Sequence, residues 1–339
     1  MTNKQLRYFI DLTPHAKPPI PVETFAYIDY ESRCDPTTVS FGEGPDCSRF
    51  RTEAYWIRMP CMKIIDTHQH LWDLDLFGYS WCAGIPELSR SFRMADYLEA
   101  TRGLEIYKTV FVEPDVDEPF MLDETKWVLK LAEEENLLQG VVATGRPERA
   151  DFKGYLDQIA GHPALKGIRR VLHVQPDDLS ESPLFLENIR SLEAYGLSFD
   201  ICVLSRQLPQ AINLVRHCPG VSFILDHCGN PLVKECEDEP WKTLLKEISS
   251  FSNVACKVSG IVVNADHRNW IPEDLRPYIE YVIEVFGSDR VMFGSDWPVC
   301  TLAASYRKWV AALTLLTKAT GESNQRKLFL ENAERIYRL

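Results

Sequence analysis

Two histidines, His68 and His70, stand two residues apart directly after the short apolar run 63–67. Because the side chains of a strand alternate between its two faces, both imidazoles should project to the same side. Two neighbouring imidazoles at the end of a buried strand form a pair that can bind a metal ion or transfer protons. The same tripeptide also occurs by chance, and two histidines hydrogen-bonded at a strand end are the alternative interpretation.

Ionisable residues also stand at the ends of the other apolar runs. Burying such groups is costly unless each has a partner or a function. Each one alone could belong to a structural ion pair, but their shared position indicates one common site. They are Glu113, Asp115, Arg146, Arg169, Arg170, His173, Asp200, Arg206, Asp226, His227, Lys257 and Asp296.

The apolar runs themselves predict the elements that position these residues. Most are continuously apolar rather than alternating, as expected for parallel strands buried on both faces, and helical patterns lie between them. The predicted strands are 63–67, 109–113, 140–144, 167–172, 197–203, 221–226, 254–258 and 290–294. The predicted helices are 122–135, 183–195, 208–217, 240–251, 277–286, 303–319 and 324–337. Pro183, Pro240 and Pro277 fit the first turns of three of these helices.

Eight strand–helix units in about 275 residues predict a (β/α)8 barrel, the TIM barrel of the α/β class. A doubly wound open sheet is the alternative, but its glycine-rich nucleotide turn is missing after the first strand, where the two histidines stand. The sequence shows no internal repeat and no second domain. In such a barrel the active site lies at the C-terminal ends of the strands, so the ionisable residues would surround one opening.

The first part of the chain, 1–61, differs from the rest. Three prolines crowd 18–21, small and turn-forming residues dominate 37–48, and no strand or helix period is sustained. We therefore expect a loosely ordered N-terminal extension over 1–61 and a barrel domain over 62–339. The extension is either dispensable, as an upstream start codon would make it, or an arm that wraps a neighbouring molecule.

The composition excludes several classes of function. The 339 residues carry a formal net charge of -12, with a pI of about 5.2, which argues against nucleic-acid and anionic-membrane surfaces. No apolar run approaches the roughly 20 residues of a membrane span, and the N-terminus lacks the layout of a secretory signal. Ten cysteines without a CxxC pair indicate mostly reduced, buried thiols, which predicts a cytoplasmic protein.

Several sequence blocks are similar to the amidohydrolase superfamily. They are Ile-Asp-Thr-His-Gln-His-Leu-Trp at 65–72, Leu-Asp-His-Cys-Gly-Asn-Pro at 225–231 and Phe-Gly-Ser-Asp-Trp-Pro at 293–298. Gly-Ile-Arg at 167–169 and Cys-Lys-Val-Ser-Gly at 256–260 resemble its sugar-lactonase branch, which includes L-fuconolactonase and L-rhamnonolactonase. The resemblance runs from Met62 to the end of the chain. It implies a (β/α)8 barrel of the metal-dependent-hydrolase type, with His68, His70, His227 and Asp296 converging over the barrel mouth.

The resemblance also implies how a metal would be held. Superfamily members with two metal ions carry a bridging lysine after strand four and a histidine ligand after strand five. Here strand four ends in arginines and strand five offers no histidine, so the resemblance implies at most one ion. His68, His70 and Asp296 would hold a single divalent ion, zinc by preference, with one position open. The sugar-lactonase branch often functions without a tightly bound metal, and no nucleotide cofactor is expected.

Opening a lactone needs a general base for water, a stabilised oxyanion and a proton for the leaving alkoxide. We assign the base to Asp296, while His68, His70 and His227 polarise the carbonyl directly or through a metal. The alternatives are a helix N-cap role for Asp296 and a core role for His227. The predicted substrate-binding residues are Arg169, Arg170, Glu113, Trp81, Tyr79 and Lys257.

The long rim loops 72–92 and 261–277 combine aromatic and polar residues, which suits a sugar ring with hydroxyl groups. Plain closure of the surface would explain the same loops. The arginines of strand four could bind the lactone carbonyl or a carboxylate, or they could pair with Glu113 or Asp200 inside the barrel. Lys257 would belong to the same network.

Two other functions stay open at this level. A metal-dependent non-oxidative decarboxylase of the same superfamily has a similar pattern of histidines and aspartate, and it would require bound Zn²⁺ or Mn²⁺. An inactive barrel that serves as a binding subunit is the third possibility, which the complete set of histidines and Asp296 argues against. The favoured partner is a small lactone such as L-fucono- or L-rhamnonolactone. The sequence leaves open which lactone is used and whether the chain forms a homo-oligomer.

Overall fold

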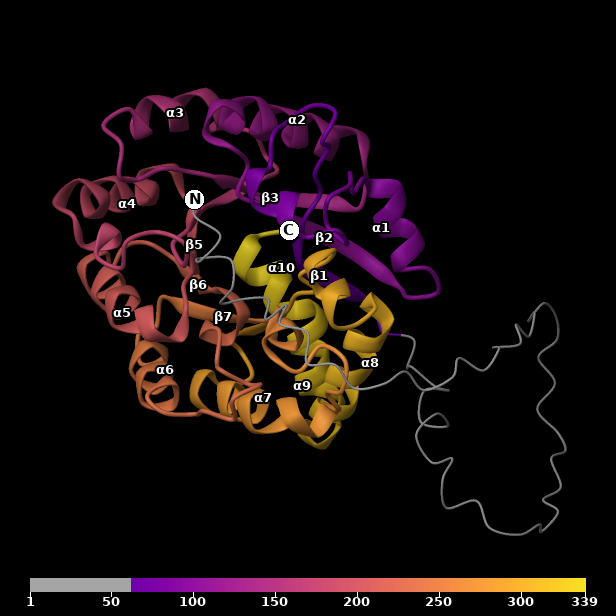
Figure 1. Cartoon of the computed structure of the whole chain (residues 1–339). Coiled ribbons are helices and arrows are strands. Elements are labelled where there is room, and N and C mark those ends of the chain that lie inside the picture. Colours follow the sequence, from indigo (N-terminus) through magenta and orange to yellow (C-terminus); the bar gives the residue numbers. More distant parts are fainter. Residues whose placement is uncertain (1–61) are drawn as a thin grey trace, which may run out of the picture. The chain divides into compact units, whose positions relative to one another are not determined.

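The computed structural model describes residues 62–339, so the prediction for the extension 1–61 lies outside the described residues. Eight parallel strands form one sheet in the order β1 to β8, and helices alternate with them along the chain (Figure 1). This arrangement confirms the predicted (β/α)8 barrel. The strands are β1 Ile64–Gln69, β2 Ile106–Val112, β3 Leu138–Thr144, β4 Leu165–Val171, β5 Ser198–Cys202, β6 Phe223–Leu225, β7 Val254–Val258 and β8 Val291–Phe293.

Most of the helices form an outer layer around the strands, whereas α10 lies inside the ring of strands (Figure 1). None of the helices between residues 62 and 339 is both long and apolar enough to cross a membrane. The helices are α1 Met94–Ala100, α2 Met121–Glu134, α3 Phe152–Ile159, α4 Pro183–Tyr195, α5 Leu208–His217, α6 Trp241–Ser249, α7 Pro272–Phe286, α8 Tyr306–Thr317, α9 Glu322–Arg326 and α10 Asn332–Tyr337.

Local sequence explains where α4 begins and ends. Pro183 occupies the first turn, where its missing amide hydrogen has no helical partner to lose. The Ser182 hydroxyl caps the helix by accepting a hydrogen bond from the Phe185 amide at 3.3 Å. Gly196 ends the helix with left-handed backbone, at a φ of 63°, which a glycine adopts without steric cost.

Several helix predictions need correction. α1 and α3 have only 7 and 8 residues, too few turns for a clear helical period, and no helix is predicted there from sequence. α7 begins at Pro272, so Pro277 lies inside the helix rather than in its first turn. The rim loop predicted at 261–277 is correspondingly shorter. The predicted last helix, 324–337, is divided by a π-helical turn at Lys327–Glu331.

The first and last strands meet and close the barrel. The amide of Asp296 donates to the His68 carbonyl at 2.8 Å, and the amide of His70 donates to the Trp297 carbonyl at 2.8 Å. The buried carboxylate of Asp66 accepts hydrogen bonds from the Ser295 amide at 2.8 Å and the Ser295 hydroxyl at 2.6 Å. This closure places the end of β1 beside the residues that follow β8.

The C-terminal segment closes the other end of the barrel. Leu330, Ala333 and Tyr337 belong to the buried apolar cluster formed by the strand interior. Figure 1 shows α10 in the middle of the ring of strands. The Tyr337 hydroxyl donates a hydrogen bond to Asp200 Oδ2 at 2.8 Å, so the C-terminal segment contacts the charged residues inside the barrel.

Seven cysteines lie within the described residues, and all seven are free thiols. Six of them are buried, in agreement with the expectation of reduced, buried thiols. Burial raises the pKa of the Cys202 thiol, which therefore stays protonated and weakly reactive.

Candidate active site at the barrel mouth

His68 near the end of β1 and His70 directly after it lie side by side at the barrel mouth. Their ring centroids lie 4.8 Å apart. The pairing of β1 with β2 shifts register between Asp66 and Gln69, and this irregularity breaks the strict alternation of faces. Asp66 consequently contacts the Tyr97 hydroxyl of α1 at 3.0 Å in the helical layer, while His68 faces the interior.

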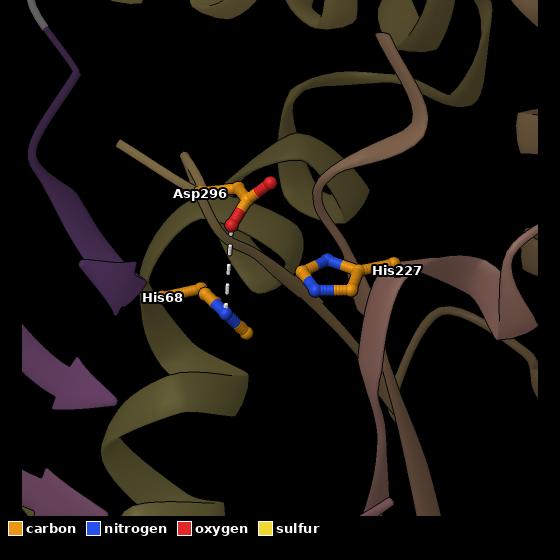
Figure 2. Close-up of side chains that lie close together, drawn as sticks. All are labelled: His68, His227 and Asp296. Carbon is orange, nitrogen blue, oxygen red and sulfur yellow. Dashed lines mark ion pairs between the residues drawn. The ribbon is translucent and has the colours of Figure 1, made fainter. Parts of the chain in front are cut away.

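His227 and Asp296 reach the same point from the turns after β6 and β8 (Figure 2). Both have left-handed backbone, with φ of 54° and 58°, a conformation rare for residues with a side chain. The His227 ring lies 4.5 Å from the His68 ring, and its Nδ1 is 3.0 Å from the Ser259 hydroxyl. A Cβ on Gly260 would lie 2.3 Å from His227 Nδ1, so glycine is required there.

Asp296 contacts both His68 and His70. Its Oδ1 lies 3.2 Å from His70 Nε2 and 3.7 Å from His68 Nε2. His70 Nδ1 lies 2.7 Å from the Val112 carbonyl, which can only accept a hydrogen bond, so Nδ1 carries a proton. A hydrogen bond on the other side then requires a further proton, either on His70 Nε2 or on Asp296. The contact therefore gives a proton on either side chain a direct path to the other.

A buried network holds His68 from below. Its Nδ1 lies 3.3 Å from Asp226 Oδ1 and 3.4 Å from Lys257 Nζ. Lys257 also contacts Asp200 Oδ2 at 2.5 Å and Asp226 Oδ1 at 3.1 Å. Nδ1 of His68 therefore lies between a carboxylate, which can only accept a hydrogen bond, and an ammonium, which can only donate one. Nε2 of His68 lies on the side of the mouth, 3.7 Å from Asp296 Oδ1.

Burial and neighbouring charges set the protonation states of this network. Burial lowers the pKa of His68 well below its ordinary value despite the opposing effect of Asp226, so the ring is neutral. Burial also lowers the pKa of His227. For Asp226, burial disfavours the charge, but Lys257, His68 and Arg169 outweigh it and hold the pKa well below the usual range. For Asp200, burial prevails and raises the pKa to about 6.

Arg169 of β4 links the network to the end of β2. Its Nε lies 3.0 Å from Glu113 Oε1, and its Nη1 lies 3.2 Å from Asp226 Oδ2 and 3.3 Å from His68 Nε2. Although burial opposes its charge, Glu113 and Asp226 raise the pKa of Arg169, which keeps it cationic. The sequence left open whether Arg169 binds the substrate or forms an ion pair inside the barrel, and the structure shows the ion pair with Glu113. Arg169 also lies beside His68.

The donor atoms at the mouth fit one divalent metal ion. Ligand atoms of His68, His227 and Asp296 lie within 4.8 Å of one another, and nitrogen and carboxylate oxygen are donors that zinc prefers. This grouping contains His227 in place of His70, which the sequence prediction included. The Arg169 guanidinium already contacts His68 Nε2. A metal ion bound to this nitrogen would take the place of that contact and would also bring a positive charge.

The balance of buried charges around the histidines also favours a bound divalent ion. Four carboxylates face two cationic side chains, which leaves an excess of two acidic groups. A divalent ion would offset this excess. The four carboxylates are those of Glu113, Asp200, Asp226 and Asp296, and the two cations are Arg169 and Lys257.

The other predicted substrate-binding residues lie farther out. Arg170 pairs with Glu148, with Nη2 2.9 Å from Oε1. Tyr79 is only 4% exposed, and its hydroxyl donates a hydrogen bond to Glu124 Oε1 of α2 at 2.7 Å. Trp81 is partly buried and donates through Nε1 to the Pro114 carbonyl at 2.6 Å, near the end of β2.

Sequence reasoning placed Asp226 and Asp200 at the strand ends, and it named Asp200 as a possible ion-pair partner inside the barrel. It assigned no specific role to Asp226 and none to Ser259. Asp200 lies within β5 and is fully buried beside Lys257. The contact of Ser259 with His227 crosses between β6 and β7, so only the folded barrel reveals it.

Known proteins resemble this chain over nearly all of its described part. A model of the amidohydrolase family matches residues 65–339. The chain belongs to the amidohydrolase family. The membership expected from the motifs is thereby confirmed, and this amidohydrolase is an enzyme of the hydrolase type.

The relatives of this amidohydrolase include a lactonase. The chain is 31% identical over 255 residues to an L-fucono-1,5-lactonase of Burkholderia multivorans, and the match covers 71% of this chain and 84% of the relative. An amidohydrolase structure from Burkholderia multivorans with bound zinc matches with a TM-score of 0.75 and 26% identity, covering 81% of this chain and 99% of the other. The 5-carboxyvanillate decarboxylase of Sphingomonas paucimobilis matches with a TM-score of 0.60, covering 82% of this chain and 99% of the other. At 15% identity this last match concerns the fold alone.

Proposed function

We propose that this amidohydrolase hydrolyses the ester bond of a sugar-acid lactone, such as L-fucono- or L-rhamnonolactone, at the barrel mouth. The observation that carries the proposal is the contact of 3.2 Å between Asp296 Oδ1 and His70 Nε2, which lets the pair exchange one proton. Ester hydrolysis needs such a group twice, once to receive a proton and once to return it. The lactonase of Burkholderia multivorans supports the choice of substrate class.

Asp296 is the proposed general base. With a proton on His70 Nε2, the Asp296 carboxylate takes a proton from water as the water oxygen attacks the lactone carbonyl. The carbon–oxygen bond of the ring then breaks, and the proton passes from Asp296 to the leaving alkoxide. The products are the open hydroxy acid and the regenerated carboxylate. The Val112 carbonyl holds the imidazole of His70 in place during both transfers.

Arg169 is the proposed partner of the developing oxyanion, because its guanidinium is a permanently charged hydrogen-bond donor. Arg169 Nη1 lies 3.3 Å from His68 Nε2, so its positive charge is next to the position of the reacting carbonyl. Asp226 keeps the Nε2 side of His68 turned toward the mouth. A divalent ion held by His68, His227 and Asp296 would supply Lewis-acid polarisation of the carbonyl.

A panel of aldono-1,4- and aldono-1,5-lactones, assayed by acidification of a pH indicator, tests the proposal. Wild-type enzyme should release acid from at least one of them. The isosteric change Asp296→Asn should lower kcat by about 10²–10⁴-fold, because the general base is lost, while circular dichroism and the melting temperature stay near the wild-type values.

The alternatives predict other results in the same assay. Lactonase activity that survives a chelator would separate hydrolysis from the metal-dependent decarboxylation. Release of CO₂ from an unsaturated or aromatic acid, with no acid from any lactone, would overturn the proposal in favour of a decarboxylase. Absence of both reactions would favour an inactive barrel. Undiminished turnover in the Asp296→Asn variant would contradict the assignment of the general base.

A further inference from the structure

A polar cluster lies beside the reacting residues, over the ends of three neighbouring strands. We call it the β2–β4 wall, and it consists of Asp115, Arg146, Glu148 and Arg170. Arg170 Nη2 lies 2.9 Å from Glu148 Oε1. Asp115 Oδ1 lies 3.5 Å from Arg146 Nη2 and 3.9 Å from Arg170 Nη1. These four side chains belong neither to the proposed proton transfers nor to the metal donors.

The wall is connected to the reacting centre through Glu113. The amide of Asp115 donates to Glu113 Oε2 at 2.7 Å, and Glu113 Oε1 lies 3.0 Å from Arg169 Nε. The exposed side-chain fraction falls along this path, from 20% at Glu148 and 17% at Asp115 to 4% at Arg169 and 0% at Glu113. The wall therefore leads from solvent to the reacting residues.

Asp115 has a backbone conformation that few residues other than glycine adopt. It is left-handed, with a φ of 55°, as are those of His227 and Asp296 at two other strand ends. Burial, and the nearby charge of Glu113, raise the pKa of its carboxyl group to about 6 in spite of the arginines. Left-handed backbone at residues with a side chain is found more often at functional sites than elsewhere. Asp115 is the member of this group to which no role has yet been assigned.

The wall has unused capacity for hydrogen bonds. The two distances from Asp115 to the arginines exceed those of a normal hydrogen bond. Glu148 Oε2 is buried and has no hydrogen-bond partner among the described residues. A hydroxyl group can donate to such a carboxylate and accept from a guanidinium at the same time. A ligand with hydroxyl groups would satisfy both kinds of partner.

The charge of the wall selects among ligands. Its two carboxylates and two arginines balance, so a carboxylate of a substrate would find each guanidinium already neutralised. We propose that the β2–β4 wall binds the hydroxyl groups of a neutral sugar lactone and favours it over lactones that carry a carboxylate. This inference rests on the proposed lactonase function and extends it from the bond that is broken to the part of the substrate that is recognised.

Three substrates test the inference: a neutral aldono-1,5-lactone, the unsubstituted six-membered lactone, and an aldaric-acid lactone with a free carboxylate. Steady-state kcat and KM are measured for wild type, Asp115→Asn and Glu148→Gln. Asparagine tolerates left-handed backbone, so the first change removes charge with little new strain. Glu118→Gln is the matched control, because Glu118 forms an exposed ion pair with Arg149 outside the wall.

Asp115→Asn should raise KM for the aldonolactone by about 10-fold, with kcat changed by less than about threefold, because a hydrogen bond to a charged group is lost. KM for the unsubstituted lactone should stay unchanged, and KM for the aldaric lactone should fall since the wall becomes net positive. Glu148→Gln should shift all three values in the same directions, and it decides the question if Asp115→Asn does not fold. The control should match wild type.

Two results would overturn the inference while leaving the lactonase function intact. One is an equal rise of KM for the hydroxylated and the unsubstituted lactone in both variants. The other is a loss of kcat at unchanged KM, which would place the wall in the chemistry rather than in recognition. If the wild-type enzyme opens none of the three lactones, the proposed function fails and the inference fails with it.

Discussion

Lys257→Met tests how much the buried cation beneath His68 contributes. The Lys257 ammonium is fully buried and lies 2.5 Å from Asp200 Oδ2 and 3.1 Å from Asp226 Oδ1. With an effective dielectric constant of about 20, each attraction amounts to roughly 5–7 kcal/mol before desolvation is subtracted. Removing one partner of a buried pair typically destabilises a protein by about 3–5 kcal/mol, since the remaining charge is left uncompensated. We expect a loss in this range at neutral pH.

The loss should depend on pH in a definite direction. The folded-state pKa of Asp200 is about 6, above its ordinary value of 3.8, so the folded protein binds this proton more readily than the unfolded chain does. Stability therefore falls as the pH rises through this window. Lys257 lowers the pKa of Asp200, so its removal extends the window to higher pH. Lys257→Met should accordingly lose more stability at pH ~7.5 than at pH ~5.5.

The assay is equilibrium unfolding in guanidinium chloride at both pH values. The double variant Lys257→Met with Asp200→Asn should regain about 2 kcal/mol or more, because the uncompensated charge is removed. Lys153→Met is the control, since Lys153 forms an exposed pair with Glu187 at 3.0 Å, and such pairs contribute about 0–1 kcal/mol. Equal losses for Lys257→Met at both pH values, or no recovery in the double variant, would refute the reasoning.

Two further predictions concern the mouth itself. Gly260→Ala should displace the His227 ring and lower lactonase kcat by about tenfold or more, because the new Cβ would lie 2.3 Å from His227 Nδ1. Gly154→Ala is the control and should keep full activity, since a Cβ at Gly154 meets nothing within 4 Å. Equal activity in both variants would contradict the steric argument. Zinc added at ~100 times its Kd should stabilise the wild type by about 2.7 kcal/mol, seen as a higher melting temperature, whereas Asp296→Ala should show no such shift. An identical zinc shift in that variant would place the ion elsewhere.

The fold could be predicted from sequence because of how the strands are buried. Each strand of a closed parallel barrel is covered by helices on one side and by interior side chains on the other, so it reads as a continuous apolar run. The eight runs were therefore recognisable. Short outer helices were not, because α3 has only 8 residues and contains Gly154. The start of α7 was misplaced because Pro272 and Pro277 both fit a first helical turn, and only the contacts of the folded chain decide between them.

The centre of the candidate site followed from topology, and its surroundings did not. His68, His70 and Asp296 could be brought together from sequence because the strand ends of a barrel share one rim. The pairing of Asp226 with His68 depends on side-chain directions across several strands, which no local pattern encodes. The position of Asp115 depends on a left-handed turn after β2, and the sequence there carries no glycine to mark it.

The closure between β1 and β8 has a consequence for how the enzyme folds. His68 and Asp296 are separated by most of the barrel sequence, and they meet only when the two outermost strands of the unrolled sheet join. Contacts between such distant segments form slowly, since the chain between them loses much freedom on looping. Partly assembled barrels can thus hold helices and strands without any catalytic capacity. The recovery of turnover during refolding therefore measures the joining of β1 to β8, whereas circular dichroism measures the earlier formation of helices and strands.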